Sequence, residues 1–428
     1  MSYPEQTGTA IQYCPTCHNE MIVNKGYVVW CDSCNWNLNP LEKEKDTGLF
    51  AKVYLKYGLK FGNQLLAQMK AGRKIENKPT VSTLFCYLIA TLVHFTSISV
   101  CLLGVWLAYI GWGKFFIMLG AAICFIIAWV TRPQFGKVNE EILRRAEFPT
   151  LYKIVDDIAD QLGAKRVSGL TVNFEYNAAY CHYGIQGQKF IHLGLPLLAV
   201  LEPEEKVALI AHELGHGVNG DFERGFFMGT AINTLMNWHE MIRPDHILDP
   251  SPSLIDLAMV PVNLLLLGLS KILYGIIYLL VHLLWFNKQR AEYLADYLAT
   301  TVSGVDAKIK MLEKLHLNDS FQYVMQKAVL SKEDSNVFEL LRNHFKYIPA
   351  NELERVHRIA NMTNSQLDST HPPTSKRIEF LSERGQKNPA YTLSDGVQAL
   401  LQKELQQLEE RQNKNCIAFY KTNADFFY

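Results

Sequence analysis

Two long apolar runs constrain the fold of this chain more than any other feature of its sequence. Residues 84–110 are 27 consecutive positions without a formal charge, and residues 115–130 are 16 more, with a single lysine in the turn between them. About 20 apolar residues suffice for a helix to cross a bilayer, and buried core helices rarely continue that far without a charge. The two runs therefore predict a transmembrane hairpin over residues 84–131.

Two further apolar segments occupy residues 225–242 and 257–286. The second would be about 45 Å long as a helix, which is more than a bilayer requires. It carries Lys271 near its midpoint, and this side chain can either snorkel to the headgroups or line a cavity. The first contains two asparagines, a histidine and a glutamate, so it is compatible with a marginal span, a re-entrant segment or an interfacial helix.

The rest of the chain has the composition of a globular protein. Its formal net charge is zero over 428 residues, which argues against a nucleic-acid partner. Residues 137–163 have the pattern of an amphipathic helix, residues 170–180 and 189–193 have that of short strands, and helical patterns continue after residue 305. We therefore expect a mainly α membrane protein whose aqueous part contains a small sheet.

A possible metal-binding motif lies between the two apolar regions, in the order His212-Glu213-Leu214-Gly215-His216. A proline and several acidic residues about ten positions earlier are typical of a helix start, so the motif should be helical. On a helix, His212 and His216 lie one turn apart on the same face, where two imidazoles can bind one zinc ion. Glu213 then projects beside them, in the position of a general base.

A catalytic zinc needs a third protein ligand, and Glu292 is the best candidate. Asp296 follows one helical turn later on the same face. Its carboxylate could accept the second ring N–H of a metal-binding histidine and so fix the orientation of that ring. The alternative is a solvated acidic helix face.

The membrane topology is restricted by these ligands, because all three must lie on one side of the bilayer. The apolar region between them must cross the membrane twice or not at all, with residues 243–252 as the far loop if it crosses twice. Four basic residues precede the first hairpin and four follow it. By the positive-inside rule we expect a multi-pass protein of the cell (inner) membrane with its N-terminus, active site and C-terminus in the cytoplasm.

The order of these motifs resembles the HtpX and CAAX prenyl endopeptidase family of membrane gluzincins. The resemblance includes two spans, His-Glu-x-x-His, two apolar segments, Glu-x-x-x-Asp, and a late Ser-Thr-His-Pro-Pro segment at residues 369–373 followed by Arg377. It implies a zincin-like α+β catalytic domain. It also implies that His371 or Arg377 stabilises the oxyanion, although Arg377 could instead bridge structural elements through its guanidinium.

The same resemblance assigns an edge strand that binds the backbone of the substrate to Asn177, Ala178 and Ala179. An extended peptide can pair with an exposed strand edge, so this role has a physical basis. An ordinary strand inside the sheet is the alternative.

Two Cys-x-x-Cys pairs near the N-terminus, Cys14 with Cys17 and Cys31 with Cys34, have the spacing of a zinc ribbon. Redox dithiols or disulfides are the alternative. The ribbon could bind clients, bind a partner or only cap the N-terminus. The following residues, 41–83, contain lysines at helical spacing, which predicts either an interfacial basic helix or a solvated linker helix.

Together these features predict a zinc-dependent membrane endopeptidase that cleaves unfolded or membrane-associated proteins, in an HtpX-like quality-control role. A prenyl-protein processing protease and a catalytically silent zinc-binding scaffold are the alternatives. The expected cofactors are one catalytic and one structural Zn²⁺, and the expected partners are protein or peptide substrates and the lipid bilayer. The expected units are a zinc ribbon (residues 1–40), a basic linker or interfacial helix (41–83), the transmembrane hairpin (84–131), a metallopeptidase core that includes the two later apolar segments (132–304) and a helical C-terminal part of the catalytic domain (305–428).

Overall fold

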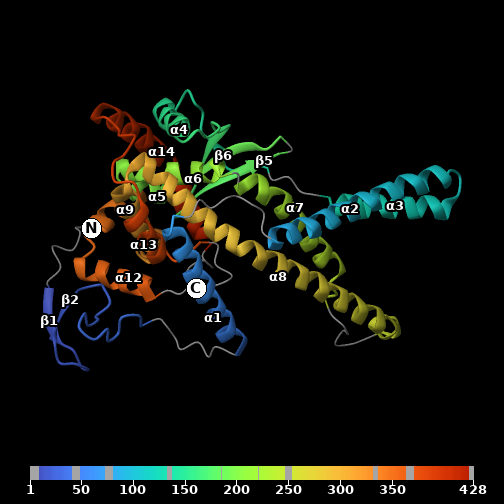
Figure 1. The fold of residues 1–428 in the computed structure, drawn as a ribbon, viewed down its shortest axis with the longest axis horizontal. Helices are drawn as coiled ribbons and strands as arrows, with labels where there is room; N and C mark the ends of the chain where they lie inside the picture. Colours follow the sequence, from blue (N-terminus) through green and yellow to red (C-terminus); the bar gives the residue numbers. More distant parts are fainter. Residues whose placement is uncertain are drawn as a thin grey trace.

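The computed structural model consists of a largely helical body from which long helices project (Figure 1). Body and projection differ in their surfaces, because large apolar side chains are exposed along the projecting helices and buried in the body. The structure describes residues 9–40, 49–72, 81–132, 137–184, 186–219, 221–245, 253–330, 336–362 and 371–423. Most of the predicted far loop, residues 243–252, therefore lies outside the described residues.

The predicted hairpin forms as two helices, α2 (Val81–Ile110) and α3 (Phe115–Val130). Leu102 on α2 and Phe116 on α3 are 62% and 84% exposed, as side chains that face lipid would be. In the part of the chain that the structure describes, α2 and α8 (Leu254–Ser303) are long and apolar enough to cross a membrane, and α3 is a shorter apolar helix.

The apolar segment that contains several polar residues, 225–242, forms most of helix α7 (Asp221–Ile242). This helix packs against both α2 and α8. One of its polar residues, His239, has a partner on a neighbouring helix: its Nδ1 lies 2.9 Å from Oγ of Ser270 on α8. Small side chains, including Ala90 and Ala231, are buried where the three helices meet. Such residues allow close helix packing in a membrane.

Helix α8 connects the membrane part to the body. It has 50 residues, so it is about 75 Å long, and it begins with a capping box between Ser253 and Asp256. Lys271 is exposed on it. Because the helix is continuous through residues 292–296, the orientation of the apolar segment and that of Glu292 are mechanically linked.

The sheet of the body has the order β3-β4-β6-β5, with strands β3 (Glu141–Ile142), β4 (Gly169–Asn173), β5 (Ala178–Tyr183) and β6 (Gln188–Gly194). β4 and β6 are parallel and the other pairs are antiparallel. Strand β5 lies at one edge.

The predicted helix over residues 137–163 is wrong in its first half. Residues 141–142 form β3, and α4 begins only at Pro149 and ends at Leu162. Proline is favoured in the first helical turn, and Glu141 pairs with Val172 of β4 instead of continuing a helix. The short strands expected within residues 170–180 are confirmed as β4 and the start of β5, with residues 174–177 between them.

The remaining helices surround one hydrophobic core. Helix α6 (Pro203–Val218) crosses its centre, with every residue from Glu205 to Gly215 buried, and a capping box between Glu202 and Glu205 defines its start. The other helices are α5 (Leu195–Val200), α9 (Val305–Leu315), α10 (Asn318–Leu330), α11 (Val337–Lys346), α12 (Ala350–Met362), α13 (Thr374–Arg384) and α14 (Asp395–Thr422).

The lysine-rich segment forms α1 (Leu49–Lys70), whose last turns pack on the body. Leu65 and Met69 belong to the main core, and Lys70 forms ion pairs with Glu379 and Glu383 of α13. Leu65 and Met69 are thus covered by the body, whereas Phe61 is exposed on the same helix, so the choice between an interfacial helix and a linker helix stays a prediction.

The N-terminal ribbon carries a hairpin of β1 (Thr9–Tyr13) and β2 (Glu20–Asn24), and it lies against α12 at one side of the body (Figure 1). Arg355 of α12 donates a hydrogen bond of 2.9 Å to the carbonyl of Leu38. Arg358 donates to the carbonyl of Asp32, and its guanidinium lies 5.0 Å from the ring centroid of Trp30. The ribbon therefore contacts the body through residues 30–38, and Asn351 adds a hydrogen bond to the carbonyl of Ile22 on β2.

Candidate active site and metal centres

Three predicted metal ligands converge from two helices. His212 and His216 project from α6, and Glu292 projects from α8. Nε2 of His212 lies 3.6 Å from Oε2 of Glu292, and Nε2 of His216 lies 3.5 Å from Oε1. Two donors bound at tetrahedral angles to one zinc ion are about 3.4 Å apart. The spacing therefore suits a single zinc ion.

Close packing of the two helices makes this convergence possible. A Cβ atom at Gly215 would lie only 3.1 Å from Cα of Ala295, so a larger residue would push α6 away from α8. Glu292 is 6% exposed, and its Oε2 has no hydrogen bond within the described residues, although Nδ1 of His371 is 2.9 Å away. A bound cation would satisfy this buried oxygen.

Asp296 lies behind the histidines, where the sequence places it. Its Oδ1 is 3.0 Å from Nδ1 of His212, whose other ring nitrogen faces Glu292. With the hydrogen on Nδ1, the lone pair of Nε2 is free to bind a metal. The carboxylate is fully buried.

Arg377 is buried between the acidic residues. Its Nε lies 2.6 Å from Oδ2 of Asp296 and its Nη2 lies 2.7 Å from Oδ1, so the guanidinium binds both oxygens. The same Nη2 is 3.4 Å from Oε2 of Glu292. This geometry favours the bridging role of Arg377 over that of an oxyanion donor, because its Nε and Nη2 already face carboxylates.

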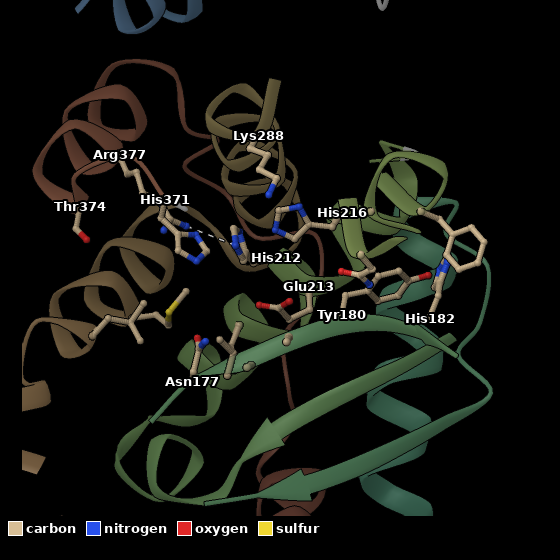
Figure 2. Close-up of a pocket in the computed structure, with 18 of the residues that line it drawn as sticks. Asn177, Tyr180, His182, His212, Glu213, His216, Lys288, His371, Thr374 and Arg377 are labelled. Carbon is tan, nitrogen blue, oxygen red and sulfur yellow. Dashed lines mark hydrogen bonds between the residues drawn. The ribbon is translucent and has the colours of Figure 1, made fainter. Parts of the chain in front are cut away.

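His371 differs from Arg377 in being half exposed, with 51% of its side chain accessible. It lines the same cleft as His212 and Glu213, and in Figure 2 it lies beside His212. It can therefore contact a bound molecule. Ser369 and Thr370, which belong to the same predicted segment, lie outside the described residues.

The cleft in front of these residues has a volume of about 700 Å³. Asn177, Ala178 and Ala179 line it together with Glu213, and Figure 2 shows Asn177 at the sheet side of the cleft. Because β5 pairs only with β6 in the described sheet, its other edge is available along the cleft. The predicted edge-strand position is thus adjacent to the metal ligands.

Sequence reasoning missed the opposite wall of the cleft. Residues of the membrane-associated helices line it, among them Thr230 and Asn233 of α7 and Lys288 of α8. The polarity of Asn233 within an apolar segment was a signal for such a role, since polar residues in membrane helices usually face a cavity or a partner. Nothing in the spacing of Lys288 distinguished it from a membrane-flanking lysine.

The ribbon cysteines form a second candidate metal centre. Sγ of Cys14 lies 3.6 Å from that of Cys34, and Sγ of Cys17 lies 3.5 Å from that of Cys31. All four are free thiols, and their sulfur atoms are mutually close enough to bind one ion. Sulfurs bound to one tetrahedral zinc are about 3.8 Å apart, so the arrangement fits a structural zinc better than a disulfide pair.

Comparisons with known proteins agree with this geometry. The model of the family described as peptidase family M48 matches residues 145–385. The Protease HtpX homolog of Pyrobaculum aerophilum is 27% identical over 253 residues, which are 55% of this chain and 67% of that protein. Protease HtpX homolog 1 of Sulfurisphaera tokodaii is 26% identical over 249 residues, or 54% of this chain and 73% of that protein.

A bacterial relative, Protease HtpX of Pseudomonas putida, is 22% identical over 265 residues, or 61% of this chain and 80% of that protein. No solved structure matches the chain significantly. The family match covers more than half of the chain and includes both histidines, Glu292, Asp296 and Arg377. Together with the candidate spans and the convergent ligands, it shows that the chain belongs to peptidase family M48, as a membrane metalloprotease of the HtpX type.

Proposed function

We propose that this metalloprotease is a zinc-dependent endopeptidase that cleaves unfolded or membrane-associated proteins at the cytoplasmic face of the cell membrane. One observation carries the proposal: the ligand cluster of His212, His216 and Glu292 opens into a cleft bounded by an edge strand on one side and by membrane-associated helices on the other. An extended segment can enter such a cleft, whereas a folded domain is too large for it.

In this proposal, His212, His216 and Glu292 hold the catalytic zinc, which supplies Lewis acidity toward a water molecule and a peptide carbonyl. Glu213 takes a proton from the attacking water and later gives it to the leaving amine. Asp296 fixes the ring of His212, and Arg377 fixes Asp296.

Substrate binding is assigned to the two walls of the cleft. Asn177, Ala178 and Ala179 bind the substrate backbone by β-augmentation along the open edge of β5. His371 stabilises the oxyanion, since it is exposed to the cleft while the guanidinium of Arg377 is occupied by Asp296. The four cysteines hold a second, structural zinc.

The cytoplasmic orientation is supported by the basic residues that flank the first hairpin. It also places the N-terminus and the C-terminus on the same side of the membrane. Fusions of reporter enzymes to the two ends test this orientation. If the N-terminal and C-terminal reporters were active on opposite sides of the membrane, the proposed orientation would be wrong.

The decisive experiment compares the wild type with Glu213→Gln in nanodiscs. The wild type should degrade an unfolded protein such as casein, stop when a zinc chelator is added and recover when zinc is restored. Glu213→Gln should retain zinc but cleave about 10²–10⁴ times more slowly. Cleavage of a prenylated C-terminal peptide in place of casein would favour the prenyl-processing alternative, and equal inactivity of both proteins on every substrate would favour the scaffold.

A further inference from the structure

Helix α9 places a lysine in the interior of the body, directly behind the metal ligands. The side chain of Lys308 has 0% exposure, and its Nζ lies 3.0 Å from Oδ1 of Asp296. Lysine is almost never fully buried unless an opposite charge compensates it, because removing an ammonium group from water is costly. Asp296 is that compensating charge.

Asp296, however, does not need Lys308 to hold it in place. Arg377 alone binds both of its oxygens, at 2.6 and 2.7 Å. Oδ1 therefore faces three groups from three helices: Nη2 of Arg377, Nδ1 of His212 and Nζ of Lys308. Because Arg377 already orients Asp296, the presence of Lys308 as a second cation at this carboxylate needs another explanation.

The net charge of the whole buried cluster explains the presence of this second cation. Glu292 and Asp296 are two carboxylates, each at most 6% exposed, and Arg377 and Lys308 are the two cations among them. Because Arg377 contacts both carboxylates, it cannot neutralise both by itself. Burial lowers the pKa of Lys308 to about 8 while Asp296 opposes that change, so the ammonium form prevails at neutral pH. The four-residue cluster is then electrically neutral.

We propose that Lys308 sets the charge of the catalytic metal centre through Asp296, and so keeps a bound zinc ion strongly electrophilic. Lys308 touches neither a ligand atom nor the cleft, and it is not a catalytic residue. Its positive charge reduces the electron density that Asp296 passes to His212 and offsets the second carboxylate. Without it, the cluster would carry one net negative charge in a water-poor interior, where such a charge acts strongly on a nearby cation.

This inference rests on the proposed function. It predicts that removing the charge of Lys308 increases the affinity for zinc and decreases the activity. Lys308→Met removes the charge while keeping a long unbranched side chain. We expect it to bind zinc about tenfold more tightly and to turn over about tenfold more slowly. Damage to packing would instead weaken zinc binding, because displaced helices no longer bring the ligands together.

The test uses the full chain in nanodiscs. Zinc affinity is measured by competition with a chromophoric chelator, the ligand field by the visible absorption of the Co²⁺ form, and turnover on casein. Lys310→Met is the matched control, since Lys310 lies two residues later on the same helix with an exposed side chain. It should leave all three measurements unchanged.

Lys308→Gln provides a second, neutral variant that keeps a hydrogen-bond donor, in case Lys308→Met does not fold. Tighter zinc binding with slower turnover in either folded variant supports the proposal. Unchanged or weaker zinc binding in the folded variants overturns it. The proposed function fails separately, if the wild type itself neither retains zinc at His212 and His216 nor cleaves casein.

Discussion

The guanidinium of Arg377 binds both carboxylate oxygens of Asp296, at 2.6 and 2.7 Å, although 81 residues separate the two in sequence. The pair joins α13 to α8 one helical turn beyond Glu292. Arg377 is 4% exposed and Asp296 is 0% exposed, so neither charge can be solvated if its partner is removed. The candidate metal ligands are therefore coupled to the packing of the C-terminal helices.

Loss of this pair should destabilise the body. Arg377→Ala leaves Asp296 and Glu292 with only Lys308 as a buried counter-ion, and breaking one side of a buried pair typically costs about 3–5 kcal/mol. Arg377→Lys keeps the charge but not the two-point contact, so its loss should be smaller. Urea unfolding in detergent measures both, with the exposed Arg384→Ala on the same helix as control. Equal stability of Arg377→Ala and Arg384→Ala would contradict the prediction.

The purified chain should contain about two zinc ions. Replacing Cys14 and Cys17 by serine should remove one of them, and replacing His212 and His216 by alanine should remove the other. The two centres involve separate parts of the chain, so each pair of substitutions should leave the other ion bound. Elemental analysis of the folded variants is the measurement. A single ion that disappears with either pair would show that the two sites are not independent.

Docking of the ribbon should depend on two arginines of α12. Arg355 and Arg358 donate hydrogen bonds to the carbonyls of Leu38 and Asp32, and each such bond contributes about 1 kcal/mol. Replacing both arginines by alanine should therefore cost about 2 kcal/mol and increase amide exchange in residues 30–38 about thirtyfold while the ribbon keeps its zinc. Lys346→Ala, an exposed position on α11, is the control. Unchanged exchange in the double variant would mean that the cysteine loops hold this segment without α12.

His316 should make the protein less stable in acid. Burial lowers its pKa to about 4, with His357 and Arg377 adding to the effect, whereas an unfolded histidine has a pKa of about 6.5. Between these values the unfolded chain takes up a proton that the folded chain does not, so the free energy of unfolding falls as the pH falls from about 6.5 to about 4. The loss attributable to this residue is at most about 3 kcal/mol.

His316→Gln cannot take up this proton and should show a smaller decrease in stability over the same range. Urea unfolding at several pH values compares the variant with the wild type. Parallel curves for the two proteins would exclude His316 as a source of the acid sensitivity.

Local patterns were sufficient to predict the two helices of the hairpin, the helical candidate metal-binding motif at residues 212–216 and the position of Asp296 one turn beyond Glu292. The hairpin follows from the length of its apolar runs, and the other positions follow from spacing within one helix: 3.6 residues a turn places His212 above His216 on α6, and Glu292 above Asp296 on α8. The same local reading failed at residues 137–148, because the pairing of β3 with β4 outweighed an amphipathic pattern that looked helical.

Features that depend on how helices pack could not be predicted in this way. The cleft wall formed by α7, the attachment of α1 through Lys70, and the contact of the ribbon with α12 all join residues far apart in the chain. Lys308 is the clearest case, since nothing in the sequence around it separates a buried counter-ion from an ordinary surface lysine. Thus the sequence by itself determined which residues can bind a metal and which segments can enter a membrane, because both follow from side-chain chemistry and helical periodicity. Only the tertiary structure decided which charges are buried beside the metal ligands, because burial depends on the packing of distant segments around them.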